Sequence, residues 1–262
     1  MPDACVVEPT ASFDAVFASD VHLSSAHPAT MQAFLRFVDE VVDGRTPRFF
    51  VLGDLFEYWA GDDDLDDPLA RSIVMRLRGL SRSGIEVAFM AGNRDFLVGD
   101  AFADAAGLRL LPDPYRTTIG DVELLLSHGD ALCVDDVDYQ RFRTMVRKPD
   151  WQRDFLARPL AERRAMIAGA RQQSESAKRE KTASIMDVND RAVGALLADH
   201  PATILIHGHT HRPAHHIHAV GRESRERWVL TDWDAEGQPA RGGGLALSAG
   251  RIVEVGAAPV GA

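Results

Sequence analysis

Five short polar motifs stand at the ends of apolar segments, and their side chains are of the types that bind metal ions and phosphate. In chain order they are Asp20-Val21-His22, Gly53-Asp54, Gly92-Asn93-Arg94-Asp95, Ser127-His128-Gly129-Asp130 and Gly208-His209-Thr210-His211. A short apolar run before turn residues is typical of a buried parallel strand. Ligands of open α/β sheets bind at the carboxyl ends of such strands, so we expect the five motifs to meet in one crevice.

The side chains of these motifs form a candidate metal-binding set of two carboxylates, one amide and four imidazoles. They are Asp20, His22, Asp54, Asn93, His128, His209 and His211. This set is too large for one tetrahedral zinc ion, and it suits two divalent cations of the manganese, iron or zinc type. The two oxygens of Asp54 could bridge both cations. If the segment after the first strand is extended, Asp20 and His22 lie on the same side of it and bind one cation.

Two adjacent divalent cations have a well-defined use in phosphate-ester hydrolysis. They lower the pKa of a bound water and neutralise the phosphoryl oxygens during attack. Arg94, next to Asn93, would add a fork of N–H donors for the same oxygens. Taken singly, Asp-x-His and Gly-Asp are weak signals, and only the ordered set is specific. The remaining histidines lack this support and are interpreted as structural or exposed: His200, His207, His215, His216 and His218.

The composition excludes several classes of protein. The net charge of −10 over 262 residues argues against a general nucleic-acid binder. No apolar stretch approaches the roughly 18 residues that a membrane-spanning helix needs. Cys5 and Cys133 form no metal-binding or redox spacing, which indicates a reducing compartment. The first residues lack a basic start followed by an apolar block, so we expect a cytoplasmic protein.

The order of expected elements is that of an α/β fold. Strands alternate with amphipathic helices that begin at Pro28 and Pro68, which predicts a parallel sheet. Gly120-Asp121 marks a hairpin, and the last strands look antiparallel. Two packed sheets with helices outside would hold all of them. We expect a core of residues 1–136 and 200–262, interrupted by a helical insertion, residues 137–199, which lies over the site as a lid.

The insertion is basic although the chain is acidic. Residues 141–181 contain twelve Lys or Arg against five Asp or Glu. A solvated helical face would explain this charge, and so would contact with phosphate or with an anionic membrane surface. Its apolar residues have two interpretations, packing between the inserted helices or lining a pocket for an apolar ligand. They are Trp151, Phe155, Leu156, Met166 and Ile167.

The ordered motifs resemble those of the calcineurin-like metallophosphoesterases, over residues 13–135 and 200–256. The resemblance implies a four-layer αββα sandwich with a dinuclear metal centre. It implies that one ion is held by Asp20, His22, Asp54 and His211. The other ion would be held by Asp54, Asn93, His128 and His209. Asp54, Asn93, Arg94 and His128 would be catalytic.

Finer details are similar to one branch of that family, the pyrophosphate hydrolases that cleave UDP-2,3-diacylglucosamine in lipid A biosynthesis. The likeness covers nearly the whole chain and lies in Gly53 to Trp59, Gly92 to Leu97 with Arg94 in place of the usual histidine, and His207 to Pro213. It implies attack of metal-activated water on the α-phosphorus, with release of UMP and 2,3-diacylglucosamine 1-phosphate. It also implies manganese as the metal and peripheral attachment to the cytoplasmic face of the inner membrane. No nucleic-acid or protein partner is implied.

Substrate contacts follow from the same likeness. They would fall on Asn93, Arg94, Asp136, Tyr139, Arg171, Ser174, Lys178, Lys181 and His209. Lys178 departs from the branch, which has a short polar amide there. Two other hypotheses stay open at this point. One is a dinuclear-metal phosphoesterase that acts on soluble nucleotides or phosphoproteins. The other is a non-catalytic binding module, which would be expected to have lost metal ligands, whereas this chain keeps all seven.

Overall fold

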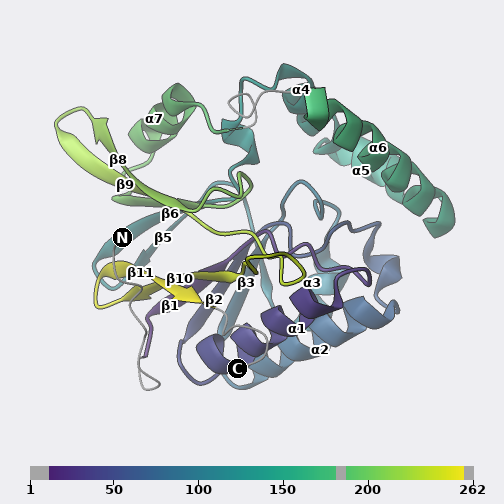
Figure 1. Ribbon diagram of the computed structural model, residues 1–262, viewed down its shortest axis with the longest axis horizontal. Helices are drawn as coiled ribbons and strands as arrows, with labels where there is room; N and C mark the ends of the chain where they lie inside the picture. The colour runs from purple at the N-terminus through teal and green to yellow at the C-terminus, as the bar shows by residue number, and fades with distance from the viewer. Residues whose placement is uncertain (1–11, 181–186, 257–262) are drawn as a thin grey trace.

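Two packed β-sheets form the centre of the molecule (Figure 1). The computed structural model describes residues 12–180 and 187–256, with the backbone alone for 173–180. The first sheet has the order β11-β10-β1-β2-β3-β4. Its strands are β1 (Ala15–Ala18), β2 (Arg48–Leu52), β3 (Glu86–Met90), β4 (Arg109–Leu111), β10 (Gly243–Ser248) and β11 (Arg251–Gly256). The run from β1 to β4 is parallel, whereas β10 and β11 are antiparallel, as predicted.

The second sheet has the order β5-β6-β7-β9-β8. Its strands are β5 (Tyr115–Ile119), β6 (Val122–Ser127), β7 (Ile204–His207), β8 (Ala214–Val220) and β9 (Glu223–Val229). The predicted hairpin at Gly120 joins β5 and β6, and Gly120 has φ +58°. Strands β8 and β9 pair antiparallel, as expected for the last strands, whereas β9 pairs parallel with β7.

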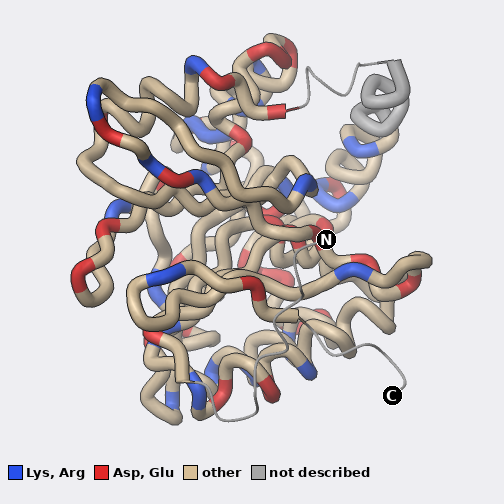
Figure 2. Tube along the Cα trace, turned by 60° about the vertical axis from the view of Figure 1, so that its left-hand side comes forward, with Lys and Arg blue, Asp and Glu red and all other residues tan. Residues whose placement is uncertain are grey.

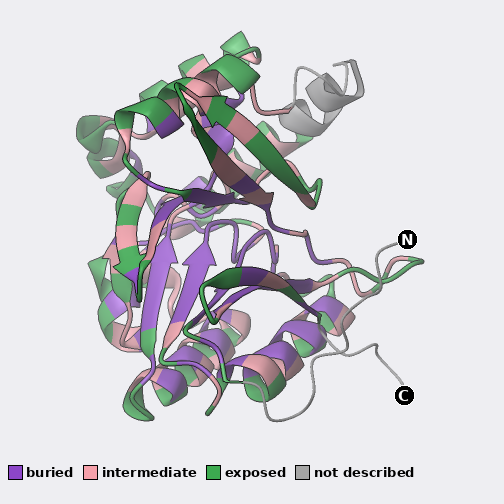
Figure 3. Cartoon of the chain, turned by 90° about the vertical axis from the view of Figure 1, so that its left-hand side faces the viewer, coloured by how far each residue is buried: buried purple, intermediate pink, exposed green. Residues whose placement is uncertain are grey.

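Alternating side chains divide each strand between two apolar layers, which is how a buried parallel sheet contacts cores on both faces. Phe17, Phe50 and Leu126 belong to the core between the sheets, whereas Val16 and Phe49 belong to the core under the helices. The first sheet is covered by α1 (Pro28–Phe37), α2 (Pro68–Arg82) and α3 (Asp100–Ala106). Figure 3 shows the buried strands and the exposed outer faces of the helices. The predicted αββα sandwich is therefore confirmed.

Local signals explain where the first two long helices begin. Pro28 and Pro68 occupy first-turn positions, where the missing N–H costs nothing. Asp67 caps α2 by accepting hydrogen bonds from the backbone N–H groups of Leu69 and Ala70. The first helix does not end regularly, since a five-residue π-helical turn, Val38–Val42, follows it.

The described part of the insertion, residues 137–180 and 187–199, is helical, as predicted. It consists of α4 (Val137–Val146), α5 (Pro149–Leu156), α6 (Leu160–Glu180) and α7 (Asp190–Asp199). Figure 1 shows α4, α5 and α6 grouped at one end of the sandwich. Helix α7 behaves differently, because Val193 and Leu197 are buried in a cluster with Leu125 of β6 and Leu205 of β7. This helix forms the fourth layer of the sandwich rather than part of a lid.

The apolar residues of the insertion divide into two sets. Phe155 is buried in the core under the helices, and Trp151 and Ile167 pack against it. Leu156 and Met166 remain 39% and 43% exposed. Packing against the core therefore explains Trp151, Phe155 and Ile167. Only Leu156 and Met166 remain available to contact an apolar ligand.

Most arginines of the insertion contact other groups of the protein. The arginines from 141 to 171 each contact an acidic side chain or a backbone carbonyl: Arg141, Arg143, Arg147, Arg153, Arg158, Arg163, Arg164 and Arg171. Figure 2 shows acidic residues interspersed with basic ones along these helices. The local excess of positive charge is thus a weaker sign of a free cationic surface than the sequence indicated.

Candidate metal centre

The predicted ligands lie in tight turns at the strand ends, and most of them have an unusual backbone conformation. Among the described residues, six non-glycine residues have positive φ, and five of them are predicted ligands: Asp20 (53°), His22 (52°), Asp54 (53°), His209 (69°) and His211 (55°). The extended geometry expected for Asp20 and His22 is therefore wrong. A left-handed residue with a Cβ costs about 1–2 kcal/mol. Strain concentrated in this way marks a functional site.

Three glycines give the ligand side chains the space they occupy. A Cβ at Gly92 would lie 2.1 Å from Asp54 Oδ1, and one at Gly53 would lie 2.4 Å from His128 Nδ1. A Cβ at Gly208 would lie 2.1 Å from Asp20 Oδ2. The glycines of the motifs are thus required by close approach of the ligands, as well as by the turns.

The ligand atoms form two groups of the size that a metal ion needs. Asp20, His22 and His211 form the first group, and Asp54, His128 and His209 form the second, with the atoms of each group within 4.8 Å of one another. In the first group, His211 Nε2 lies 3.4 Å from Asp20 Oδ1 and 3.2 Å from His22 Nε2. In the second, Asn93 Oδ1 lies 3.0 Å from His128 Nε2 and 2.8 Å from His209 Nδ1.

Asp54 stands between the two groups. Its Oδ2 lies 3.8 Å from His22 Nε2, and its Oδ1 lies 3.7 Å from His128 Nε2. The backbone N–H of Arg94 donates to Oδ1 at 2.8 Å and so fixes the rotation of the carboxylate. Each oxygen of Asp54 therefore faces a different group, which is the arrangement that a bridging carboxylate requires.

Several electron-pair donors in this cluster face one another, and ligands of a bound cation have this arrangement. His128 Nδ1 lies 2.9 Å from the carbonyl of Leu52, which can only accept, so Nδ1 carries a proton; Nε2, 3.0 Å from Asn93 Oδ1, is the nitrogen that a neutral His128 would present to a cation. Asp20 Oδ2 accepts from Ser19 Oγ and from the N–H of His209, whereas the buried Oδ1 has no hydrogen-bond partner among the described residues and lies 3.4 Å from His211 Nε2. Such groups are costly to bury without a partner. Hard and borderline divalent cations match this donor set.

Glu57 orients the first group. Its Oε2 lies 3.0 Å from His22 Nδ1, within ion-pair distance, while Oε1 contacts Arg171 and lies 3.9 Å from Arg94 Nη1. Burial would raise the pKa of Glu57, but the hydrogen bond from His22 and the two guanidinium groups lower it to about 2. An ionised Glu57 fixes the proton of His22 on Nδ1 and turns Nε2 toward Asp54, as carboxylates behind metal-binding histidines do.

The two buried imidazoles of the second group have opposite pKa shifts. Burial disfavours the imidazolium of His128, but the charges of Asp54, Asp130 and Asp20 raise its pKa to about 9. Burial and the neighbouring His128 lower the pKa of His209 to about 4. The carboxylates thus create a strongly negative potential at His128, and a metal ion would respond to the same potential.

Comparison with known proteins places the chain in a family. The profile of the calcineurin-like phosphoesterases matches residues 14–213. The chain belongs to the calcineurin-like phosphoesterase family. A relative from Aromatoleum aromaticum is 52% identical over 219 residues, which cover 84% of this chain and 89% of that protein. Relatives from Chromobacterium violaceum and Bordetella pertussis are 46% and 44% identical, over 90% and 88% of this chain and 95% and 90% of theirs. All three are named UDP-2,3-diacylglucosamine hydrolase.

The predicted substrate residues of this phosphoesterase lie partly beside the metal groups. Arg94 and Arg171 approach Glu57, and the ring of Tyr139 stacks on that of His209 with centroids 5.9 Å apart. Asp136 caps α4 by accepting from the N–H of Tyr139. The side chains of Ser174, Lys178 and Lys181 lie outside the described residues.

Three carboxylates of the sequence motifs support the ligands without being predicted ligands themselves. Glu57 holds His22, as described above. Asp95, fully buried, accepts from the backbone N–H groups of Asp54, Leu55, Phe56 and Gly92, so it fixes the turn that carries the bridging residue. Asp130 accepts from Tyr139 and Arg143. Each lies within three residues of a predicted ligand, and this proximity is the signal that could have identified them.

Proposed function

We propose that this phosphoesterase hydrolyses the pyrophosphate bond of UDP-2,3-diacylglucosamine, with water attacking the α-phosphorus and UMP and 2,3-diacylglucosamine 1-phosphate as products. The observation that carries the reaction class is the division of the ligands into two groups with Asp54 between them. The substrate is supported by the name of relatives that are 42–52% identical over most of the chain. The reaction is part of lipid A biosynthesis.

Two divalent cations are the cofactor that this site would hold. We propose Asp20, His22, Asp54 and His211 as the ligands of one ion, and Asp54, Asn93, His128 and His209 as those of the other. Bound there, the ions supply a nucleophilic water at neutral pH and neutralise phosphoryl oxygens. Manganese is the metal we propose, because the resemblance to the UDP-2,3-diacylglucosamine hydrolases implies it, and the donor set suits divalent cations of the manganese, iron or zinc type.

Two arginines are placed to bind the diphosphate. Arg94 comes from the turn after β3 and Arg171 from α6, and both side chains approach the Glu57 carboxylate. Because a guanidinium group binds phosphate oxygens through paired N–H donors, we propose that the diphosphate takes these donors when it binds. We further propose substrate contacts for Asn93, Asp136, Tyr139, Ser174, Lys178, Lys181 and His209.

The lipid substrate leads to a proposed location. In the part of the chain that the structure describes, no helix is both long and apolar enough to span a bilayer. We propose that the protein acts at the cytoplasmic face of the inner membrane as a peripheral protein, where its lipid substrate and product reside. The exposed Leu156 and Met166 of the insertion are candidates for contact with the acyl chains.

Hydrolysis in ¹⁸O-labelled water tests the reaction and its direction together. UDP-2,3-diacylglucosamine and UDP-N-acetylglucosamine are compared with manganese and after chelation. We expect metal-dependent turnover of the lipid nucleotide alone, with ¹⁸O in UMP. Label in the sugar phosphate would place the attack on the β-phosphorus. Equal turnover of both nucleotides would contradict an acyl-specific substrate, and full turnover after chelation would contradict the use of metal ions.

A further inference from the structure

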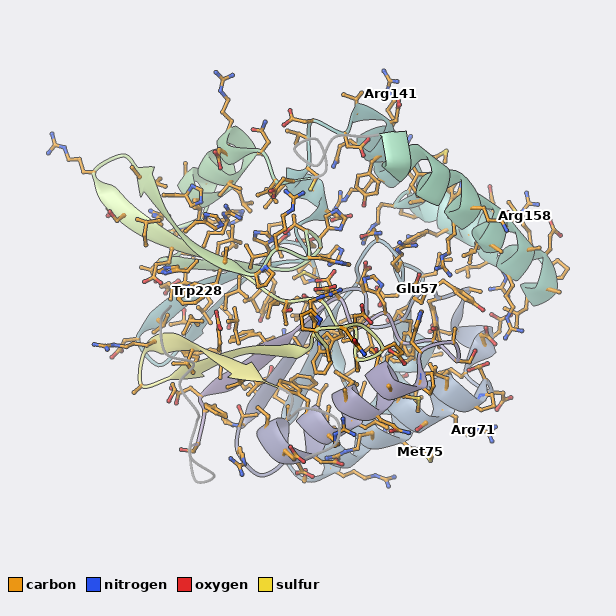
Figure 4. All side chains as sticks on the ribbon, in the orientation of Figure 1. Glu57, Arg71, Met75, Arg141, Arg158 and Trp228 are labelled. Atoms are coloured by element: carbon orange, nitrogen blue, oxygen red, sulfur yellow. The ribbon has the colours of Figure 1, made fainter. Side chains whose placement is uncertain are left out.

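Two side chains of α4 and that of the residue capping its C-terminal end form a single stripe that faces the core. They are Tyr139, Arg143 and Arg147, spaced four residues apart, and residues at this spacing lie on the same side of a helix. Arg141 lies on the same helix outside this stripe, with its side chain 76% exposed. Figure 4 shows Arg141 pointing away from the body of the protein.

Arg147 binds the backbone of the turn that carries Asn93. Its Nη2 donates to the carbonyl of Gly92 at 2.8 Å and lies 3.3 Å from that of Ala91. The guanidinium carbon also lies 5.8 Å from the centre of the Phe96 ring, on the far side of Asn93 in the sequence. Arg147 thus holds the turn at both ends, and this turn supplies the amide oxygen of the second metal group.

The other two members of the stripe reach the turns that carry the two histidines of that group. Arg143 Nε and Tyr139 Oη donate to Asp130 Oδ2 at 2.8 Å and 2.6 Å, and Asp130 comes two residues after His128. The ring of Tyr139 also stacks on His209, with an interplanar angle of 26°. One helix stripe therefore contacts the three turns that carry Asn93, His128 and His209.

The first metal group is supported by a different helix. His22 Nδ1 contacts Glu57, and Glu57 contacts Arg171 of α6. Figure 4 shows Glu57 between the sheets and the inserted helices. The insertion thus reaches the two groups through separate side chains, with α4 behind one group and α6 behind the other.

We propose that α4 is a positioning element for one ion of the pair, acting mainly through Arg147, and that Glu57 is the corresponding positioning residue for the other ion. Arg147 would act without touching substrate, by fixing the carbonyl of Gly92 and hence the direction of the Asn93 side chain. This inference rests on the proposed dinuclear centre. It predicts that the affinities of the two ions can be changed separately, one through Arg147 of the insertion and the other through Glu57 of the core.

Manganese titration of the full chain by calorimetry, with the number of bound ions counted by elemental analysis, tests this proposal. We expect two ions per wild-type chain. Arg147→Met should lower the affinity for one ion by about tenfold to a hundredfold, which is the usual cost of losing a residue behind a metal ligand. The affinity for the other ion should stay within about twofold of the wild-type value. Arg141→Met removes the same group from the exposed side of α4 and should leave both affinities unchanged.

Two further variants identify the site and control for folding. Arg147→Lys keeps one donor for the Gly92 carbonyl and should restore part of the lost affinity, with a matching recovery of kcat at unchanged KM. Glu57→Gln should lower the affinity for the other ion. The double variant Arg147→Met/Glu57→Gln should therefore bind both ions more weakly than the wild type. If the double variant keeps one tight ion, or if Arg147→Met and Arg147→Lys bind both ions like the wild type, the proposal is wrong. If the wild-type chain binds no manganese, the proposed function itself fails.

Discussion

At the residue scale, the backbone of the metal centre is as informative as its side chains. Five predicted ligands have left-handed backbone conformations that a side chain makes costly. The ligand side chains lie so close to Gly53, Gly92 and Gly208 that a Cβ at these positions would have no room. The strained turns thus bring charged and polar atoms together at the metal centre. Such strain does not stabilise the fold, so it indicates a functional role.

Replacement of Asp54 by asparagine separates a catalytic role from a structural one. Asparagine tolerates the left-handed conformation and can still accept the N–H of Arg94, but it has one oxygen and no charge. We therefore expect kcat to fall by at least about a hundredfold, beyond the usual effect of supporting residues, with little change in thermal stability. Steady-state kinetics and thermal unfolding measure both, and Asp66→Asn, at an exposed position, is the control. A near-normal kcat would contradict the bridging role.

The thiol of Cys133 is expected to be inert in the folded protein. It is 2% exposed, and burial together with the charge of Asp130 raises its pKa to about 12. Because the folded value lies above the ordinary 9.0, the unfolded chain loses the proton first, and stability from this group falls as pH rises from about 9 toward about 12. In a Cys5→Ser variant at pH 8, mass spectrometry should detect alkylation by iodoacetamide only after unfolding in urea. Rapid alkylation of the folded chain would contradict this expectation.

At the element scale, the sequence predicted what depends on local patterns. Apolar runs followed by glycine and polar residues located the strand ends, and Pro28 and Pro68 located two helix starts. The same patterns could not assign α7 to the sandwich, because an amphipathic helix has the same sequence pattern whether its apolar face contacts a sheet or other helices. They also could not show the left-handed turns, since the backbone N–H groups of Asp20 and His22 donate to the carbonyls of Gly53 and Asp54, which are distant in the sequence.

The links between the insertion and the core were equally hidden in the sequence. Arg163 of α6 is 1% exposed and donates to the carbonyls of Ala60 and Arg158 and to Asp63. A composition count treats this arginine as part of a charged surface. Only the folded chain shows that its charge is compensated by groups 100 or more residues away.

Arg163→Met should therefore destabilise the attachment of α6, whereas Arg158→Met should not. Loss of the buried donors leaves carbonyls without partners and should lower the free energy of unfolding by about 1–3 kcal/mol. Arg158 pairs with Glu162 four residues along the helix, with both side chains about half exposed, so its replacement should cost less than about 0.5 kcal/mol. Urea unfolding and limited proteolysis of the insertion compare the two. Equal effects would mean that Arg163 does not tie the insertion to the core.

At the scale of the whole molecule, the two sheets and the inserted helices bring together residues from positions 20 to 211. The centre buries Asp20 and Asp54 in a chain whose net charge is already −10. Bound cations would compensate these buried carboxylates in the folded state alone, because the unfolded chain does not form the two groups. Metal binding and stability should then be coupled.

Manganese should raise the thermal stability of the chain in a saturable way. An ion present at a hundred times its dissociation constant stabilises the folded state by about 2.7 kcal/mol, so two independent sites would add roughly twice that amount. Thermal unfolding over a manganese series, with a chelator to reverse the effect, measures this stabilisation. The increase should shrink in Asp54→Asn. An identical increase in that variant would place the ions elsewhere on the protein.

Anomalous X-ray diffraction from crystals grown with manganese tests the central claim most directly, because it locates the ions without reference to activity. We predict two anomalous peaks per chain, about 3.5–4 Å apart, on either side of the Asp54 carboxylate. One peak should contact His22 and His211, and the other should contact Asn93, His128 and His209. A single peak, or peaks remote from Asp54, would contradict the dinuclear centre on which the proposed hydrolysis depends.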